Sequence, residues 1–352
     1  MKIKKTILAL FCALIIQNIT IAQSDTVKAK ILDSGSQNAE KFYNSGIASF
    51  GSKNFKEAVS SFNEAIALKA DFEKAYFNRG VAKFELKDNV GALEDFDKSL
   101  SLAQNPESYF YRGQTKFAMD NRTGASEDYS KAIEIKLDYA QAYYYRGEVK
   151  FEDKDYKGAI DDFTQAIKIK PDYAYAYNDR GSAKRQLEDL DGAIADYKKA
   201  LSTNPEMAFT SNNLASTERK KGDYKAAISD YTEAINKKKD YYVAYNNRGS
   251  AKIDAADYEG AIADFNKAIE LKADYAYAFN NRAAAKFKLK DYKGCVDDCT
   301  KAIQLNPTYA RAYLNSGIAK EMLRDELGAC VDWKKSIELG DETAKNYAGD
   351  CK

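Results

Sequence analysis

Small and aromatic residues recur along the chain at spacings of three and four residues, with polar and charged residues between them. Ala159, Phe163 and Ala166 give one example of this order. Residues four and three apart share one face of a helix, so each such triplet predicts an amphipathic helix. A second helical pattern, centred on glycine or alanine, precedes each triplet. The chain is therefore predicted to consist of short helices arranged in pairs.

The pairs form a repeat, which we number so that the glycine or alanine is position 8. This residue recurs every 34 residues, except for one step of 33, at Gly46, Gly80, Gly113, Gly147, Gly181, Ala215, Gly249, Ala283 and Gly317. Position 20 is small, position 24 is mostly aromatic and position 27 is small. Nine repeats follow, with the bounds 39–72, 73–105, 106–139, 140–173, 174–207, 208–241, 242–275, 276–309 and 310–343.

Helix start and stop signals fall at fixed places in the repeat. An aspartate that can cap the second helix occurs at Asp88, Asp155, Asp189, Asp223, Asp257, Asp291 and Asp325. Pro171, Pro205 and Pro307 lie at position 32, where proline ends the second helix because it cannot continue the hydrogen-bond ladder.

This pattern resembles the tetratricopeptide repeat (TPR), which shares the period, Gly at 8, Ala at 20, an aromatic residue at 24, Ala at 27 and Pro at 32. The resemblance covers residues 39–343. It implies an all-α solenoid, in which antiparallel helix hairpins form a right-handed superhelix and the first helices line a concave groove. It also implies a scaffold that binds proteins or peptides and is not an enzyme.

Two charged rows depart from the family, which often has Leu at position 7 and Tyr at position 11. Position 7 is Arg79, Arg112, Arg146, Arg180, Arg248 and Arg282, and position 11 is Lys83, Lys116, Lys150, Lys184, Lys252, Lys286 and Lys320. Position 23 is aspartate from Asp95 to Asp332 in all but the first repeat. We predict ion pairs between these rows and the aspartates, because a guanidinium can hold a carboxylate through two bonds. A charged stripe that contacts a ligand is the alternative.

The predicted groove changes its chemistry along the chain. Position 5 is aromatic in the first four repeats, at Tyr43, Phe77, Phe110 and Tyr144, and becomes amide afterwards, at Asn178, Asn212, Asn246 and Asn280. Position 6 adds Asn213, Asn247, Asn281 and Asn315. An amide offers both donors and an acceptor, which suits a peptide bond. This row is similar to the one in O-linked N-acetylglucosamine transferases, where it holds an extended peptide. The alternative is that position 6 hydrogen-bonds to neighbouring repeats.

The eighth repeat also looks like the middle repeat of co-chaperone TPR domains that clamp a terminal carboxylate. Asn281 matches the clamp asparagine and Arg311 matches the first basic residue of the following repeat. Asn315 replaces the second basic residue, and Asn246 and Ser250 stand where Lys and Asn are expected. The clamp is therefore incomplete.

The two ends of the chain carry separate signals. Lys2, Lys4 and Lys5 precede the apolar run 7–16, which predicts a signal peptide over 1–22 and an exported protein, periplasmic or secreted. After cleavage we expect no integral membrane segment, a polar leader over 23–38 and a capping helix over 344–352. In an oxidising compartment Cys330 and Cys351 could form a disulfide.

Composition narrows the function further. Lys and Arg number 54 against 53 Asp and Glu, so the basic excess typical of nucleic-acid binding is missing. The chain has no histidine, which removes the commonest general base and metal ligand. We expect no catalysis, no cofactor and no metal. The sequence favours a protein-binding scaffold of the bacterial cell envelope. The alternative is a glycan or cell-wall binder that uses the aromatic half of the groove, and self-association stays open.

Overall fold

The computed structural model describes residues 34–351, so the predicted signal peptide lies outside the described residues. The described chain divides into two compact units, with the boundary between residues 153 and 154 of the sequence. Its longer elements are α-helices joined by short turns, as predicted for an all-α repeat protein. The first unit holds α2 Ser34–Gly51, α3 Phe55–Leu68, α4 Glu73–Glu85, α5 Asn89–Leu102, α6 Pro106–Ala118, α7 Arg122–Ile135 and α8 Ala140–Glu152.

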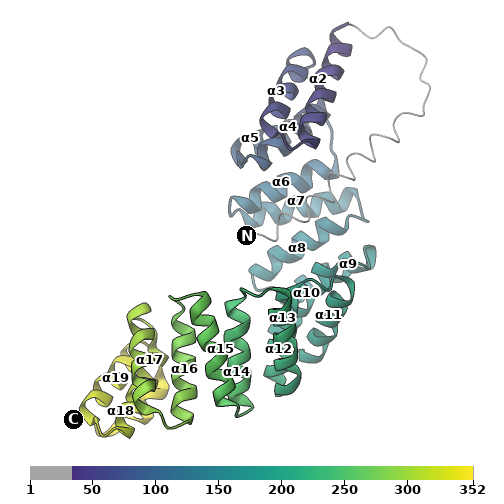
Figure 1. Ribbon diagram of the computed structural model, residues 1–352. Coiled ribbons are helices and arrows are strands. Elements are labelled where there is room, and N and C mark those ends of the chain that lie inside the picture. The colour runs from purple at the N-terminus through teal and green to yellow at the C-terminus, as the bar shows by residue number, and fades with distance from the viewer. Residues whose placement is uncertain (1–33, 352) are drawn as a thin grey trace. The chain divides into compact units, whose positions relative to one another are not determined.

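The second unit continues with the same helix lengths. Its α-helices are α9 Tyr156–Ile169, α10 Ala174–Gln186, α11 Leu190–Thr203, α12 Ala208–Lys221, α13 Tyr224–Lys237, α14 Tyr242–Asp254, α15 Tyr258–Leu271, α16 Ala276–Lys288, α17 Tyr292–Leu305, α18 Ala310–Met322 and α19 Glu326–Glu338. From α10 onward each even-numbered helix forms a hairpin with the next helix, and successive hairpins pack side by side (Figure 1). The first helix, α2, begins at Ser34, inside the segment predicted as a polar leader.

In repeats with glycine at position 8, the two helices of a hairpin approach so closely that a Cβ atom there would press on the aromatic ring at position 24. A Cβ atom on Gly80 would lie 2.8 Å from the ring of Phe96, the aromatic residue at position 24 of the same repeat. A Cβ atom on Gly249 would lie 2.7 Å from the Phe265 ring. The Phe265 ring is fully buried and clusters with Ala285 of the next hairpin. The aromatic residue therefore joins the two helices of its own hairpin and also contacts the neighbouring one.

The turn between the two helices has a fixed construction. The seven predicted cap aspartates each accept a bond from a backbone N–H three residues later, as Asp155 does from Gly158 at 3.0 Å. The residue before the cap has a positive φ, for example 64° at Lys154 and 89° at Gly222. Glycine adopts this left-handed conformation without strain, whereas the other repeats place a longer side chain there.

The predicted ion-pair ladder is present, and each aspartate binds both basic residues rather than one. Asp196 accepts from Arg180 Nε at 2.9 Å and Nη2 at 2.6 Å, and its Oδ2 lies 2.8 Å from Lys184 Nζ. The same arrangement forms around Asp95, Asp128, Asp264 and Asp298. The aspartates are buried at the contact between the two helices of a hairpin, so the ladder is part of the interior.

The C-terminal cap is helical, as predicted. It consists of two short 3₁₀ helices, η1 Glu342–Asn346 and η2 Ala348–Asp350. Gly340, with φ of 92°, ends α19, and only one residue separates the two short helices. The cap still covers the last hairpin, because Ala344 is fully buried in a cluster with Leu314 and Trp333. Cys330 on α19 and Cys351 after η2 are joined as a disulfide, with their Cα atoms 5.4 Å apart.

We expect replacement of both Cys330 and Cys351 by serine to loosen the cap while the rest of the array stays folded. The bond closes a loop with a sequence separation of 21 residues, and opening it returns conformational freedom to the cap. Amide hydrogen exchange in η1 should accelerate by about tenfold or more, since local opening sets that rate. The buried, unbonded Cys295 and Cys299 offer a control, because replacing them by alanine should leave exchange in η1 unchanged. Equal exchange in both variants would show that the bond does not hold the cap.

Candidate functional site

The candidate site of the second unit lies on the first helices of its repeats, α10, α12, α14, α16 and α18. Small residues at position 3, such as Ala244 and Ala278, are fully buried and turn one side of each helix toward the core. Positions 6, 9 and 12 lie farther out, and Asn247, Ser250 and Ile253 on α14 are half-buried. These positions share a face because they are three residues apart.

Position 5 belongs to the interior, although the sequence assigned it to the groove. Asn246 is 6% exposed and Asn280 is 4% exposed. Their amides face the next repeat. A ligand on the surface therefore meets position 6 and not position 5.

Hydrogen bonds join the amides of neighbouring repeats, and we call this set the amide row. In the sixth to ninth repeats, the asparagine at position 6 donates from Nδ2 to Oδ1 of the position-5 asparagine in the preceding repeat. The distances are 3.3 Å from Asn213 to Asn178, 3.1 Å from Asn247 to Asn212, 3.0 Å from Asn281 to Asn246 and 2.9 Å from Asn315 to Asn280. The bonds between neighbouring repeats are thus observed. One Nδ2 bond also leaves each amide with a second N–H, so the same residues can face a ligand.

The aromatic residues of the first unit are packed rather than presented. Phe110 and Tyr144 are each 4% exposed. Phe77 packs on Phe96 at 6.1 Å between ring centroids. Tyr43 lies 5.0 Å from Phe72 between ring centroids, and burial raises the pKa of Tyr43 to about 12. This geometry provides no open row of rings at position 5 for a sugar.

Arg311 is exposed and pairs with the cap, where its Nε lies 3.3 Å from Asp341 Oδ2. Asn281, the other clamp-like residue, bonds to Asn246. Both residues are therefore engaged within the protein in this structure, one with the cap and the other with the preceding repeat.

Sequence reasoning missed two features of this face. Position 2 carries aromatic residues that meet across repeats, and Tyr175 stacks on Phe209 with centroids 6.1 Å apart. Position 12, apolar in most repeats, is Arg185 and Arg219 in the fifth and sixth repeats. Reading position 12 through all nine repeats would have revealed this change, whereas the aromatic contacts required the structure.

The sixth repeat also breaks the ion-pair ladder. Leu214 and Glu218 replace the usual Arg and Lys, so Glu218 shares its site with Asp230. Glu218 is 5% exposed, and its nearest cation is Lys198, whose Nζ lies 3.7 Å away. Burial, followed by the charge of Asp230, raises the pKa of Glu218 to about 7. Burial raises the pKa of Asp230 as well.

The described residues also bear on metal binding and on membrane crossing. Within residues 34–351, no three His, Cys, Asp or Glu side chains gather in a way that could hold a metal ion. Over the same residues, no helix combines the length and apolar character that a membrane crossing requires.

Family models match several of these repeats. A model described as tetratricopeptide repeat matches residues 140–173, 174–207 and 276–309, a second of that description matches 210–240, and one described as TPR repeat matches 253–290. The matched segments agree with the predicted bounds of the fourth, fifth and eighth repeats.

Curated relatives match short segments. RNA polymerase II-associated protein 3 of Xenopus laevis is 43% identical over 74 residues, which is 21% of this chain and 11% of the relative. Photosystem I assembly protein Ycf3 of Acaryochloris marina is 36% identical over 88 residues, which is 24% of this chain and 53% of the relative. The chain thus spans about half or less of the length of these curated relatives.

Solved structures show the same fold. A tetratricopeptide repeat protein from Parabacteroides merdae has a TM-score of 0.58 at 17% identity, over 70% of this chain and 98% of that one. The C-terminal part of a TPR repeat-containing protein from Cytophaga hutchinsonii has a TM-score of 0.55 at 19% identity, over 67% and 98%.

Proposed function

Because the chain belongs to the tetratricopeptide-repeat family, we propose that it is a non-catalytic scaffold that binds an extended peptide segment on the first helices of its second unit. TPR repeats typically serve protein–protein interaction. Binding of an extended peptide is supported by the amide row from Asn213 to Asn315. This row places one half-buried amide in each of four successive repeats.

The row suits an extended peptide in its chemistry. Its amides are already oriented by bonds to the preceding repeat, so a ligand would not have to order them. Each can donate a second N–H to a backbone carbonyl, and its Oδ1 has a further lone pair for a backbone N–H. Such contacts recognise backbone and not sequence, so specificity must come from neighbouring positions.

We expect the double variant Asn247→Ala/Asn281→Ala to bind peptide about tenfold more weakly than the original chain. The peptide would be chosen from a random dodecapeptide library by selection on the full chain, and its affinity measured by fluorescence anisotropy. Two lost hydrogen bonds of ordinary strength account for an effect of this size.

The matched control is Asn212→Ala/Asn246→Ala. It breaks the same two bonds between repeats from the buried side and keeps the amides at position 6. Similar losses of affinity in both variants would show that the row only joins repeats. Selection of no peptide, combined with binding to a polysaccharide array, would favour the glycan alternative.

We also propose that the protein works outside the cytoplasm, in the cell envelope or the medium. The support is the basic and apolar sequence of residues 1–22. Cell fractionation followed by sequencing of the mature N-terminus tests it, and an intact Met1 in the cytoplasmic fraction would rule it out.

A further inference from the structure

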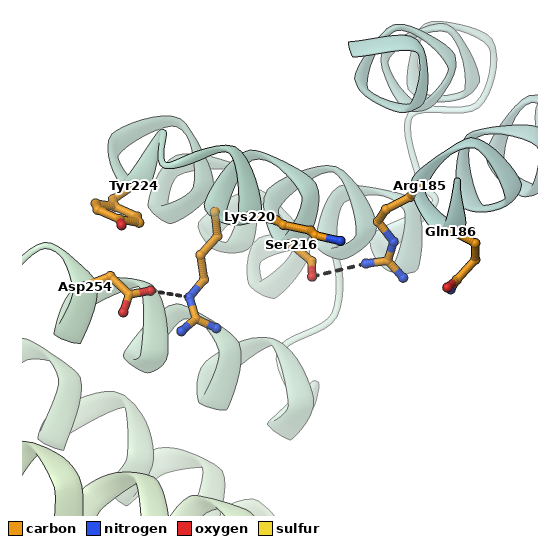
Figure 2. A pocket seen from close by; sticks show the side chains of 7 residues that line it. Arg185, Gln186, Ser216, Lys220, Tyr224 and Asp254 are labelled. Carbon is orange, nitrogen blue, oxygen red and sulfur yellow. Dashed lines mark hydrogen bonds and ion pairs between the residues drawn. The ribbon is translucent and has the colours of Figure 1, made fainter. Parts of the chain in front are cut away.

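A polar cavity of about 460 Å³ lies among the C-terminal ends of α10, α12 and α14 (Figure 2). Its lining consists of Arg185, Gln186, Ser216, Arg219, Lys220, Tyr224 and Asp254. These residues come from three successive repeats. Three of them are cationic at neutral pH and one is anionic, so the lining has an excess of positive charge.

The cations of this cavity differ in how fully they are neutralised. Arg219 Nε donates to Asp254 Oδ2 at 2.6 Å, and Lys220 Nζ donates to Glu188 Oε1 at 2.6 Å. Arg185 instead donates from Nη1 to the Ser216 hydroxyl at 3.3 Å (Figure 2). Within the described residues, no carboxylate lies at ion-pair distance from Arg185, whereas Arg180, five residues earlier on the same helix, is held by Asp196. Arg185 therefore keeps guanidinium donors for a ligand.

The cavity lies on the face that carries the amide row. Asn213, Ser216 and Lys220 follow one another on α12 at spacings of three and four residues, so they share one side of that helix. The amide row and the cavity are therefore open to a ligand from the same side of α12.

We propose that this cavity receives a carboxylate side chain, Asp or Glu, of the peptide segment bound on the second unit. The inference rests on the proposed function. A planar guanidinium holds a carboxylate through two parallel bonds, and Ser216 supplies a further donor. Asp254 disfavours a dianion more than a monoanion, which selects a carboxylate over a phosphate monoester.

The test compares peptides selected from a random dodecapeptide library on the original chain and on the variant Arg185→Gln/Arg219→Gln. On the original chain we expect Asp or Glu at one fixed peptide position. That preference should disappear on the variant while the remaining positions keep theirs. A control variant, Lys199→Gln/Lys225→Gln, removes the same charge from exposed sites on α11 and α13 and should keep the acidic preference.

A selected peptide then separates the outcomes. Replacing its acidic residue by the matching amide should weaken binding to the original chain about tenfold and change binding to the variant little. Peptides enriched without a fixed acidic position would overturn this inference and leave the proposed function standing. Tighter binding of a phosphoserine version would overturn the choice of carboxylate. Enrichment of no peptide at all would count against the proposed function itself.

Discussion

Replacing Asp196 by alanine is expected to lower the free energy of unfolding by about 3–5 kcal/mol, because it leaves two cations inside a hairpin without their counterion. Asp196 is 4% exposed, and the side chains of Arg180 and Lys184 are 16% and 22% exposed. Neither cation can reach full hydration without separating the two helices. Urea denaturation followed by circular dichroism measures the change.

The same helix supplies the control. Asp191 pairs with Lys221, but its side chain is 81% exposed. Exposed pairs contribute about 0–1 kcal/mol, so Asp191→Ala should change stability little. Arg180→Ala should have an intermediate effect, since Lys184 remains on Asp196, and it should lower stability more than peptide affinity. Equal effects of Asp196→Ala and Asp191→Ala would contradict a structural role for the ladder. Loss of binding after Arg180→Ala with unchanged stability would restore the alternative of a ligand-contacting stripe.

The ladder shows what a repeated sequence reveals about contacts. The ion pairs between positions 7, 11 and 23 could be predicted from the sequence. Basic residues at 7 and 11 recur together with an aspartate at 23 in many repeats, so the same pairing is expected in each of them. The helix hairpins and the aspartate caps were also predictable, because their residues recur at the same positions of the repeat. The contact between Gly80 and the ring of Phe96, in contrast, came from the structure, which places the ring directly on the glycine.

Burial was harder to predict where both neighbouring positions are asparagine. Asn246 and Asn247 are adjacent and identical, and only the helix rotation decides which one faces the next repeat. A shift of about 100° per residue separates an interior amide from a surface amide. The capping helix was predicted without its type, because so short a sequence lacks the full amphipathic period that would distinguish an α-helix from 3₁₀ turns. The change to arginine at position 12, at Arg185 and Arg219, is visible in the sequence. Only the structure shows that one arginine bonds to Ser216 and the other to Asp254.

Replacing Glu218 by lysine is expected to raise the free energy of unfolding by about 2–3 kcal/mol at pH 8. Lysine is the residue at position 11 of most other repeats, where it binds the aspartate at position 23. In the sixth repeat that aspartate is Asp230, which now faces Glu218 instead of a cation. The substitution removes a carboxyl pair with raised pKa values and supplies Asp230 with the partner found elsewhere.

The original chain should also lose stability as the pH rises. The pKa of Glu218 is about 7 in the folded protein and has an ordinary value of 4.5. Between pH 4.5 and 7, the unfolded chain releases this proton while the folded chain retains it, so unfolding becomes more favourable as pH increases. After allowance for screening by solvent and by Lys198, we expect a loss of about 1–2 kcal/mol across this window. The chain has no histidine to produce a competing transition in the same range.

Urea denaturation of the original chain, Glu218→Lys and Glu218→Gln at pH 5, 6, 7 and 8 measures both the stabilisation at pH 8 and the dependence of stability on pH. Both variants should lose most of the decrease between pH 5 and 7, and Glu218→Lys should be the more stable at pH 8 because it alone can pair with Asp230. Glu206→Lys makes the same charge change at an exposed position and should keep the pH dependence of the original chain. The charges of Lys198, Asp223 and Asp230 act on the Glu218 carboxyl group and set the midpoint of this transition. If Glu218→Gln retained the full decrease, another group would be responsible, and the buried carboxyl pair of the sixth repeat would no longer explain it.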